Sequence, residues 1–465
     1  MATLTHLTPS FIINNGLLDQ FGYKVTLIKA TNKSQAELGV TNYFRQFAIY
    51  ESLFSKFMYV EGNIYDGGGI AQKIGFQAGD ILRFTLFKDE SDTKTEMIIK
   101  DFYIESIGGQ KRNPNQKGAS YTFLAVSKCG KEASSTTIKR SYNKKGKDII
   151  MDICTQVLQL TPEEMSFNTF SNTSGLTPTA NFEDTYGDIS LIMPSVPPFE
   201  AIEFVLQQCI SNTDKIAGNN FFFYETRDGV ILRALKTIVA SGKTHEYRMP
   251  VDKNRSKDGP DQDYLSTQSV HHAKSNNQRE NLNQGILENQ TLSFDFISRS
   301  ITKQSFNLKE DHKGILLMGE YLLLDSDEIE NYTGSQRVTD EQQSLFVRCS
   351  NKSYDKAEDY YELAGGTTRA QIQLLNQTQI TIKILGNPKI KPGDTINLKV
   401  AQPDNELLED RDPILGGKYL VASCKHVVSD AIDYITLVDL FKDGYERDVG
   451  AYRKDTHSHF IKEKV

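Results

Sequence analysis

Apolar and polar residues alternate along several short stretches between residues 23 and 128, and this period of two is typical of half-buried strands. Glycine-rich turns separate these stretches at "DGGG" (66–69), "AGD" (78–80) and "GGQKRNPNQKG" (108–118). Many short strands with such punctuation indicate a β-sandwich or a β-barrel. The predicted strands are "YKVTLIKA", "FMYVEGNIYD", "DILRFTLF", "MIIKDFYIESI" and "SYTFLAV".

The period changes between residues 131 and 250. "KDIIMDICTQVLQL" (147–160) and "PFEAIEFVLQQCI" (198–210) each place their apolar residues on one helical face, with Cys154 and Cys209 on those faces. "NFFFYETRDGVILRAL" reads as a hairpin that turns at Asp228-Gly229. This part of the chain is therefore predicted to be a small α+β domain.

Strand patterns resume after a polar, turn-rich connection at residues 251–285, which we expect to be a long loop. They begin with "QTLSFDFISRS" and "GILLMGEYLLL", followed by an acidic, irregular insertion that contains the apolar patch "SLFVRC". A short helical piece, "TTRAQIQLLNQ", then precedes more strands, and residues 446–465 form a polar tail without a core pattern.

The two β regions share an order of signals. "AGDILRFTL" (78–86) and "PGDTINLKV" (392–400) each follow a Gly-Asp turn with a strand. In each copy, a strand that begins with a tyrosine (Tyr103 or Tyr419) comes next, and a third strand follows. The matched apolar positions are Leu82, Phe84 and Leu86 in the first copy and Ile396, Leu398 and Val400 in the second. This order predicts two copies of one β-barrel.

The predicted fold class is therefore mainly β with a smaller α+β part, namely two antiparallel β-barrels plus an inserted α+β domain. The predicted divisions are 1–130 for the first barrel, 131–254 for the α+β middle domain, 255–324 and 367–445 for the discontinuous second barrel, 325–366 for the acidic insertion and 446–465 for the tail.

Composition narrows the function. The chain has 465 residues, which suits two to four domains, and 53 basic against 60 acidic residues give a net charge of −7. This balance argues against a dedicated nucleic-acid binder. We expect no signal peptide in the first twenty residues and no membrane span, because no apolar run is long enough. The five cysteines are far apart, without a C-x-x-C pair, and are typical of reduced thiols.

Cys424 and His426 are the most suggestive candidate site, because they lie two apart in "LGGKYLVASCKHVVSD". Alternation places Leu420, Ala422, Cys424, His426 and Val428 on one face of a strand. A closed metal site needs four ligands, and no second Cys/His pair is nearby in the sequence. We therefore interpret this stretch as a barrel strand with a small apolar cysteine and a buried or rim histidine.

The other candidates also favour structural interpretations. His271 and His272 lie in the polar connection. "TIVASGKT" (237–244) lacks the first glycine of a phosphate loop, and "HEYRM" (245–249) lacks the second histidine of a zinc-protease helix. "DGGGIAQKIG" (66–75) lacks dinucleotide spacing, and the acidic "DNELLEDRD" (404–412) is a solvated loop or an acidic docking surface. No catalytic, cofactor-binding or metal residue and no cofactor is predicted.

Three longer stretches, in order, carry a resemblance. "IYESLFSKFMYVEGNIYDGGGIAQKIGFQAGDILRFTLF" resembles the opening barrel of the central baseplate hub protein of contractile-tailed phages. "LIMPSVPPFEAIEFVLQQC" with "GNNFFFYETRDGVILRAL" is similar to the middle domain of that family. "IKILGNPKIKPGDTINLKV" with "LGGKYLVASCKHVVSDAIDYITLVDLFKDGY" resembles its closing barrel. The resemblance covers most of residues 20–445.

The resemblance implies a non-enzymatic homotrimer with two tail-tube-like barrels per chain. Six barrels in a ring would adapt a sixfold tail tube to a threefold spike. The implied partners are the tail-tube protein, the trimeric spike, which often carries a lysozyme, the tape-measure protein and the wedge proteins. DNA would pass through the lumen without specific binding, in a virion tail baseplate assembled in the host cytoplasm. The alternatives are a tail-associated cell-wall hydrolase, a receptor-binding β protein and the spike-hub component of a bacterial contractile secretion system.

Overall fold

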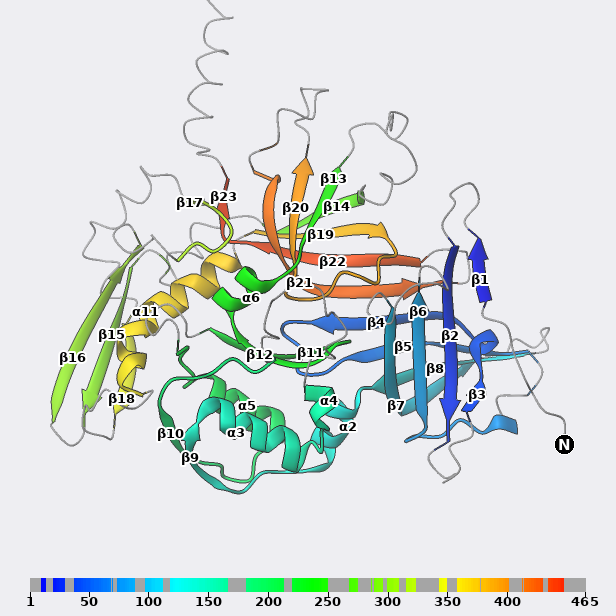
Figure 1. The fold of residues 1–465 in the computed structure, drawn as a ribbon, viewed down its shortest axis with the longest axis horizontal. Helices are drawn as coiled ribbons and strands as arrows, with labels where there is room; N and C mark the ends of the chain where they lie inside the picture. The colour runs from blue at the N-terminus through cyan, green and yellow to red at the C-terminus, as the bar shows by residue number, and fades with distance from the viewer. Residues whose placement is uncertain are drawn as a thin grey trace, which may run out of the picture.

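The chain is mainly β, with one large sheet and a smaller α+β part, as the sequence predicts (Figure 1). This computed structural model describes residues 10–13, 20–29, 37–67, 69, 73–87, 97–111, 118–165, 181–212, 220–249, 267–274, 286, 288–295, 299–308, 315–322, 343–348, 358–376, 378–400, 412, 414–429 and 434–446. The acidic stretch 404–411 and the tail from 447 onward lie outside the described residues.

The first β unit contains six strands in the order β2-β6-β7-β8-β5-β4, with every neighbouring pair antiparallel. Their bounds are Gln20–Ile28 (β2), Phe44–Ser52 (β4), Tyr59–Asp66 (β5), Ile81–Phe87 (β6), Ile98–Lys111 (β7) and Ala119–Val126 (β8). Two short strands, Ser10–Ile13 (β1) and Glu37–Gly39 (β3), pair with β2, and the 3-10 turn Thr41–Tyr43 leads into β4.

The second β unit repeats this order as β13-β20-β21-β22-β19-β14. Its strands are Thr244–Met249 (β13), Thr267–Lys274 (β14), Thr378–Leu385 (β19), Thr395–Val400 (β20), Gly417–Val428 (β21) and Tyr434–Lys442 (β22). The predicted repeat of strand connectivity is confirmed. One strand differs in direction, because β13 runs parallel to β20 whereas β2 runs antiparallel to β6.

The repeat extends to the ladder registers. A β-bulge follows Ile104 in β7 of the first unit, and an equivalent bulge follows Val421 in β21 of the second. A second matching bulge follows Phe44 in β4 and Thr267 in β14. Since a bulge adds one residue to one strand only, its recurrence fixes the alignment of the two units. Each unit also encloses an apolar core to which its strands contribute, and Val428 and Tyr434 of the second unit join the core of the first.

The registers decide which predicted matches between the copies hold. Leu82 and Phe84 oppose β7 as Ile396 and Leu398 oppose β21, so the predicted match of these strands is confirmed. The predicted match of Tyr103 with Tyr419 is wrong by one residue, because the register aligns Tyr103 with Leu420. Tyr419 is fully buried in the second core, whereas Tyr103 carries the ammonium of Lys131 over its ring.

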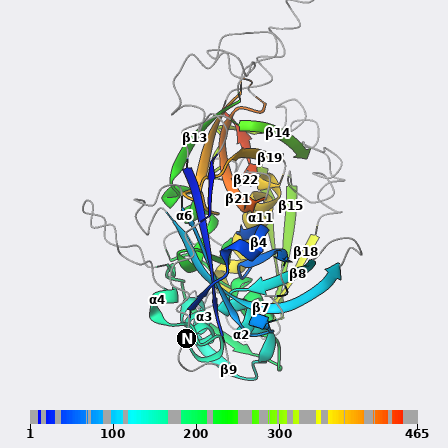
Figure 2. The ribbon, with the colours of Figure 1, turned by 90° about the vertical axis from the view of Figure 1, so that its right-hand side faces the viewer.

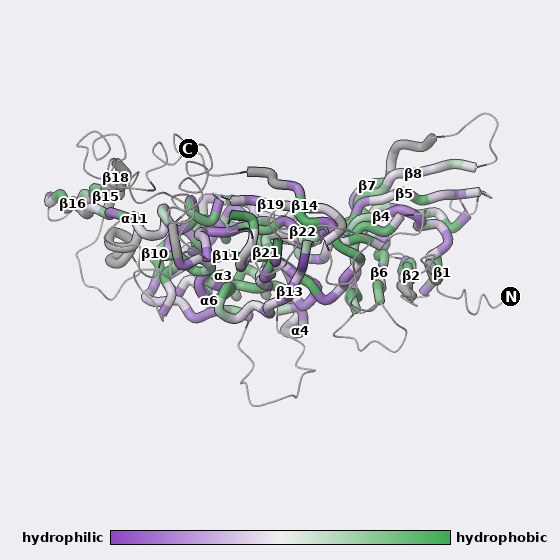
Figure 3. Tube along the Cα trace, turned by 90° about the horizontal axis from the view of Figure 1, so that it is seen from above, coloured by the Kyte–Doolittle hydropathy of each residue, from purple (hydrophilic) through white to green (hydrophobic). Residues whose placement is uncertain are grey.

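The two units join into one sheet through β21. Its first half pairs with β20, and its second half, from Ser423 to Val428, pairs with β4 of the first unit. Eight neighbouring strands, β7-β8-β5-β4-β21-β22-β19-β14, therefore form a continuous sheet, here called the junction sheet. Seen from above, β4, β5, β8 and β7 of the first unit lie beside the overlapping strands β22, β19 and β14 of the second (Figure 3).

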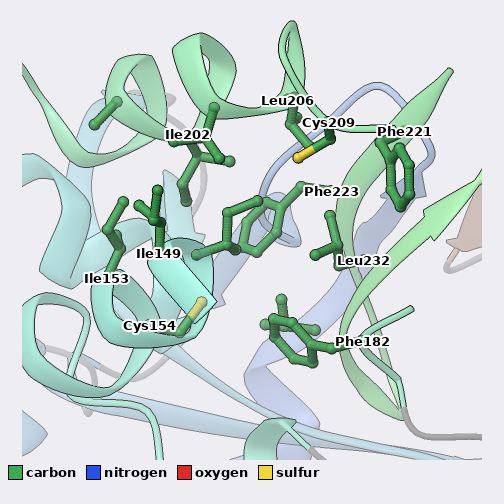
Figure 4. Close-up of a cluster of buried hydrophobic side chains, with 14 of the residues drawn as sticks. Ile149, Ile153, Cys154, Phe182, Ile202, Leu206, Cys209, Phe221, Phe223 and Leu232 are labelled. Carbon is green, nitrogen blue, oxygen red and sulfur yellow. The ribbon is translucent and has the colours of Figure 1, made fainter. Parts of the chain in front are cut away.

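The α+β part lies at the end of the molecule opposite β13 and β14 (Figures 1 and 2). Its elements are Lys128–Ser135 (α2), Ser141–Lys145 (β9), Gly146–Asp152 (α3), which continues as a π-turn at Ile153–Val157, Pro162–Met165 (α4), Asp188–Ile192 (β10), Pro198–Leu206 (α5), Phe221–Thr226 (β11), Gly229–Ala234 (β12) and Leu235–Ser241 (α6). The two predicted helices are confirmed. The second helix is shorter than predicted, because α5 ends at Leu206 and Cys209 lies just past it. The buried faces of the helices, with Cys154 and Cys209 beside them, pack on Phe223 and Leu232 of the hairpin (Figure 4).

A third sheet stands apart from the junction sheet. Strands Glu288–Asp295 (β15), Ser300–Asn307 (β16) and Gln343–Arg348 (β18) pair with one another, and helix Glu358–Leu375 (α11) packs beside them. A two-residue strand, Tyr321–Leu322 (β17), pairs with Gly444–Tyr445 (β23). The helix is longer than predicted and begins inside the expected irregular insertion. Gly365 and Gly366 lie inside it, and paired glycines lower the helix propensity of this segment.

The expectation of a loop throughout 251–285 is also wrong in part, because β14 lies within it. The sequence of β14, "TQSVHHAK", carries almost no apolar alternation. Its position is fixed instead by the antiparallel ladder with β19, from Thr267 opposite Ile384 to Lys274 opposite Gln379.

Candidate functional site

The tip of the β11–β12 hairpin lies between the two β units and carries charged side chains to both of them. Its turn residues are Arg227 and Asp228, because Thr226 and Gly229 form the last ladder pair, so the predicted turn at Asp228-Gly229 is wrong by one residue. Gly229 has a φ of +115°, and a Cβ there would lie 2.5 Å from the carbonyl oxygen of Glu164. Glycine is therefore required where the hairpin turns.

Glu225 attaches the hairpin to the first unit. Its carboxylate lies 2.7 Å from Nζ of Lys100 in β7, and it accepts hydrogen bonds from the N–H of Met58, at 3.0 Å, and from the hydroxyl of Ser127. Burial lowers the pKa of Lys100, but attraction and hydrogen bonding to Glu225 outweigh it, and the net pKa is raised. Lys100 therefore stays charged inside the protein.

Arg227 connects both units at once. Its Nη2 atom lies 3.1 Å from Oε1 of Glu51 in β4, and it also donates to the carbonyl oxygen of Ile390 in the second unit. Burial raises the pKa of Glu51, while the guanidinium opposes this rise. The Glu51 carboxyl is fully buried, so the arginine is the charge that compensates it.

His426 completes this buried cluster on the side of the second unit. Its Nε2 atom lies 3.4 Å from Nη2 of Arg227, and its Nδ1 atom lies 2.9 Å from the hydroxyl of Tyr434 and 3.2 Å from that of Thr436. Burial and the arginine hold the pKa of His426 well below its usual range. Because a guanidinium can only donate, the neutral ring accepts at Nε2 and carries its proton on Nδ1.

Asp228 forms the last connection, a contact of 2.7 Å with Lys391 beside the second unit. Both of these side chains are about a quarter to a third exposed, at 25% for Lys391 and 30% for Asp228. The hairpin tip, defined by Glu225, Arg227 and Asp228, therefore holds the two units by three ion pairs, of which the two that involve Glu225 and Arg227 are buried.

These residues are arranged to hold the two β units together. The carboxylates are compensated by fixed cations, and the thiol of Cys424 has a pKa raised well above its usual value by burial. A protonated, buried thiol is a poor nucleophile and a poor metal ligand. Within the residues that the structure describes, no group of three or more His, Cys, Asp or Glu side chains is placed to hold a metal ion.

The structure places the remaining candidates in ordinary elements. Cys424 and His426 lie in β21, which confirms the predicted strand, but Leu420 and Cys424 serve different cores because the bulge at Ala422 reverses the alternation. His271 and His272 are in β14, not in a loop. Gly242 follows helix α6, and His245 lies in β13, where its Nε2 atom is 3.0 Å from Asp394. The prediction that none of these residues is catalytic stays a prediction.

Local sequence gave no signal for the hairpin tip. Glu51 and Arg227 are 176 positions apart, and Arg227 and His426 are 199 apart. A charged residue in a turn between two apolar strands is ordinarily solvated, so the sequence indicated an exposed turn here. Only the docking of the hairpin between the units buries it.

The junction sheet has a second face, opposite the two cores, here called its open face. Ser, Thr, Asn and Gln side chains dominate it together with a few tyrosines and aliphatic residues. Among its members are Gln46, Tyr50, Tyr59, Glu61, Asn63, Ser106, Thr122, Leu124, Ser269, His271, Gln379, Thr381, Lys383, Ser423, Lys425, Val427, Ile435, Leu437 and Asp439.

Charge in the middle of the open face is balanced and largely paired. Among the open-face side chains that the structure describes, Glu61 and Asp439 stand against Lys383 and Lys425. The ladder registers add one lysine at each end of this face, Lys111 opposite Ser120 and Lys274 opposite Gln379. Lys425 lies 3.9 Å from Glu61 and 4.5 Å from the ring centre of Tyr50, and Asp439 accepts hydrogen bonds from the hydroxyls of Thr381 and Ser423. The middle of the face is therefore polar and nearly neutral, while its two outer strands, β7 and β14, each add a lysine.

No family model matches the chain, and no curated protein matches its sequence. Solved phage tail proteins match its structure. The tail protein from Neisseria meningitidis MC58 matches with a TM-score of 0.50 at 9% identity, over 90% of this chain and 97% of that one. The prophage MuSo2 43 kDa tail protein from Shewanella oneidensis has a TM-score of 0.49 at 11% identity, over 90% and 98% of the two chains.

The Neisseria match shows that this chain has the fold of a tail protein along nearly its whole described length. Prophage tail protein gp18 from Listeria monocytogenes EGD-e also matches, with a TM-score of 0.44 at 8% identity, over 94% of this chain and 98% of that one. Within the described part of the chain, no helix is long and apolar enough to cross a membrane.

Proposed function

We propose that this protein is a structural, non-enzymatic hub of a phage tail baseplate. The observation that carries the proposal is the register-matched repeat, in which two units of one fold lie edge to edge in a single sheet. Three such chains present six equivalent units, so a trimer can sit on a sixfold tube at one end and a threefold spike at the other. The shared fold with a tail protein supports this role.

The proposed partners follow from that position. They are the tail-tube protein above, a trimeric spike below, which can carry a lysozyme, the tape-measure protein and the surrounding wedge proteins of a contractile tail. The place of action is the virion tail, after assembly in the host cytoplasm.

The proposal keeps the predicted division of the chain, with units at 1–130 and at 255–324 with 367–445 around a middle domain at 131–254. Two strand assignments refine it. β13, at Thr244–Met249, goes with the second unit because it pairs with β20, and β15 and β16 go with the separate third sheet.

The hairpin tip explains how a chain with two such units stays rigid. The tip fixes the angle between the units by charges that reach both sides, and a ring of six needs a constant angle at each junction. Breaking a buried pair such as Arg227–Glu51 leaves one charge uncompensated, which typically costs about 3–5 kcal/mol. This lock therefore acts against shear between the units.

The open face supports a role as a conduit. In a ring closed by junction sheets, one face of the sheet lines the lumen, and the polar open face, nearly neutral in its middle, suits that position. Duplex DNA owes most of its non-specific affinity to Lys and Arg contacts with phosphate. A wall whose middle sets two lysines against two carboxylates, with one further lysine on each outer strand, offers few uncompensated contacts to phosphate, so DNA can leave during ejection.

The proposal is tested by mass and by DNA binding. Light scattering should give three times the mass of one chain, and linear duplex DNA should not bind at physiological salt. A Thr122→Lys and Ser423→Lys double variant adds positive charge to the open face and should gain salt-dependent binding to linear duplex, but not to a covalently closed circle, which cannot thread. Ser134→Lys on exposed α2 is the matched control. A stable monomer, or equal binding of both DNA forms, would overturn the proposal.

A further inference from the structure

One edge of the first unit has no partner in the described part of the chain. β7 pairs with β6 only from Ile98 to Tyr103, while its second half continues beside β8 as far as Lys111. The other side of that second half faces no strand. Ser106 and Gly108 on this segment are exposed. An unpaired edge of this length is a template for another strand.

The second unit shows what covers the equivalent edge. β21 corresponds to β7, and its second half also runs beyond its first neighbour, β20. There the edge is paired with β4, with Lys425 opposite Tyr50 and Val428 opposite Phe47. The internal junction therefore shows which kind of strand pairs with this edge, namely β4 on the second half of β21.

The counterpart of β4 is β14, which also has a free side. β14 pairs with β19 as β4 pairs with β5, and no other ladder joins β14 within the described residues. Ser269 and His271 are exposed along it. One chain therefore carries both halves of a junction, at opposite ends of its junction sheet.

The ladder registers convert this correspondence into residue pairs. Gly108 opposes Thr122 in the first unit as Lys425 opposes Leu437 in the second, so Gly108 corresponds to Lys425. Gln379 opposes Phe441 in the second unit as Tyr59 opposes Val126 in the first, so Gln379 and Tyr59 are equivalent. Lys274 opposes Gln379, and Tyr50 opposes Tyr59. Lys274 therefore corresponds to Tyr50.

We infer that the second half of β7 pairs antiparallel with β14 of a second copy of this chain, with Gly108 of one copy opposite Lys274 of the next. This inference rests on the proposed function and specifies its subunit contact. Because the two edges of the contact differ, the pairing is heterologous, and a closed ring forms when the rotation per copy returns to the start. With three copies, three internal junctions alternate with three junctions between copies.

The two kinds of junction differ in strength. The internal junction is reinforced by Glu51 and His426, which meet Arg227 of the hairpin tip. A second bulge follows Gly108 directly in β7, so the register gives no residue of β7 the position that His426 has in the internal junction. The junction between copies therefore depends mainly on backbone hydrogen bonds. We expect the internal junction to be the more stable of the two.

Paired cysteines test the register directly. Gly108→Cys is tolerated sterically, because a Cβ at Gly108 meets no atom within 4 Å. In the double variant with Lys274→Cys, mild oxidation should produce covalent dimers and then closed trimers on a non-reducing denaturing gel. The cysteines of the natural chain that the structure describes are all buried and should stay out of the reaction.

The chain supplies a matched positive control. Tyr50→Cys with Lys425→Cys places cysteines at the equivalent internal positions and should close within one chain, with no change in mass. A register control, Gly108→Cys with Ser269→Cys, should give no covalent trimer, since Ser269 lies several pairs away from the expected partner.

The outcomes separate the inference from the proposed function. A trimer by light scattering that gives no Gly108–Lys274 disulfide, while the internal control closes, overturns the strand pairing and leaves the trimer standing. Monomers at every concentration, without a disulfide between chains, overturn both. An open ladder of ever larger covalent species would show pairing without closure and would overturn the ring.

Discussion

Gly79 and Gly393 occupy the same turn in the two β units, with φ angles of +90° and +91°. The N–H of Gly79 donates to the carbonyl oxygen of Ile104 at 2.8 Å, and that of Gly393 donates to Val421 at 2.9 Å. Both glycines precede a buried aspartate that accepts a hydrogen bond from the backbone three residues before it. The equivalence predicted from the sequence is thereby confirmed.

Each aspartate of this turn also meets a side chain at one end of the first strand of its unit, from Lys29 directly after β2 or from His245 in β13. Asp80 lies 2.8 Å from Nζ of Lys29, and Asp394 lies 3.0 Å from Nε2 of His245. The turn thus ties the first strand to the fourth in both copies, although β2 and β13 run in opposite directions relative to that fourth strand.

We predict that valine at either glycine destabilises the protein and that Gly393→Val costs more. A non-glycine residue at a positive φ of this kind costs on the order of 1–3 kcal/mol. At Gly79 a Cβ meets no atom within 4 Å, whereas at Gly393 it would lie 3.0 Å from the hydroxyl of Tyr224 and 3.3 Å from Ile238. Urea unfolding measures the difference. Gly67→Val is the control, because that Cβ is free and the φ is not positive. Equal stability of all three variants would contradict the prediction.

Arg227→Met should lower the free energy of unfolding by about 3–5 kcal/mol, because it leaves the Glu51 carboxyl buried without its cation. The double variant Arg227→Met with Glu51→Leu should recover much of that loss. Lys391→Met is the matched control, since its partly exposed pair with Asp228 should contribute no more than about 1 kcal/mol. Denaturant melts measure all four proteins, and a double variant as unstable as the single one would show that packing, not charge, decides.

Burial lowers the pKa of Lys442 to about 8 in the folded protein. In the unfolded chain a lysine titrates near ~10.4, so between these values the unfolded state binds more protons. The free energy of unfolding contributed by this group therefore rises with pH across that window, by roughly 3 kcal/mol in total at 1.36 kcal/mol per pKa unit.

Comparison with Lys442→Met isolates this effect from tyrosines and cysteines that titrate in the same range. The wild-type protein should gain stability relative to the variant between pH 8 and pH 10. Below pH 8 the difference should be constant. A difference that falls with pH in this window would contradict the lowered pKa. The variant also loses hydrogen bonds to the carbonyls of Ile414 and Gly416, which is a pH-independent cost.

Cys424→Ala with His426→Ala should change packing but not metal content. Truncations at buried sites of this kind cost on the order of 1–3 kcal/mol. Removal of the His426 ring also takes away one hydrogen-bond partner of the hydroxyls of Tyr434 and Thr436. Elemental analysis should find no stoichiometric zinc in the wild-type protein. Zinc at one equivalent per chain that disappears in the double variant would reverse this interpretation.

The sequence by itself determined the elements whose cause is local. The Gly-Asp turns, the alternating strands β6 and β20, and the helices α3 and α5 follow from backbone freedom and from apolar periods of two or about 3.6 residues. Two sets of these signals, in the same order along the chain, were enough to predict the repeat. These features depend on residues close together in the chain, so their signals survive without coordinates.

Only the tertiary structure decided where a strand lacked such a period or where partners came from far away. β14 is polar and exists because β19 offers a ladder. The bulge at Ala422 moves Cys424 to the face of Val421, and a single extra residue of this kind leaves no mark in composition. The burial of Arg227 depends on Glu51 and His426, each more than 170 positions away. Ladders, bulges and buried ion pairs are set by which edges meet, and that is a property of the folded chain.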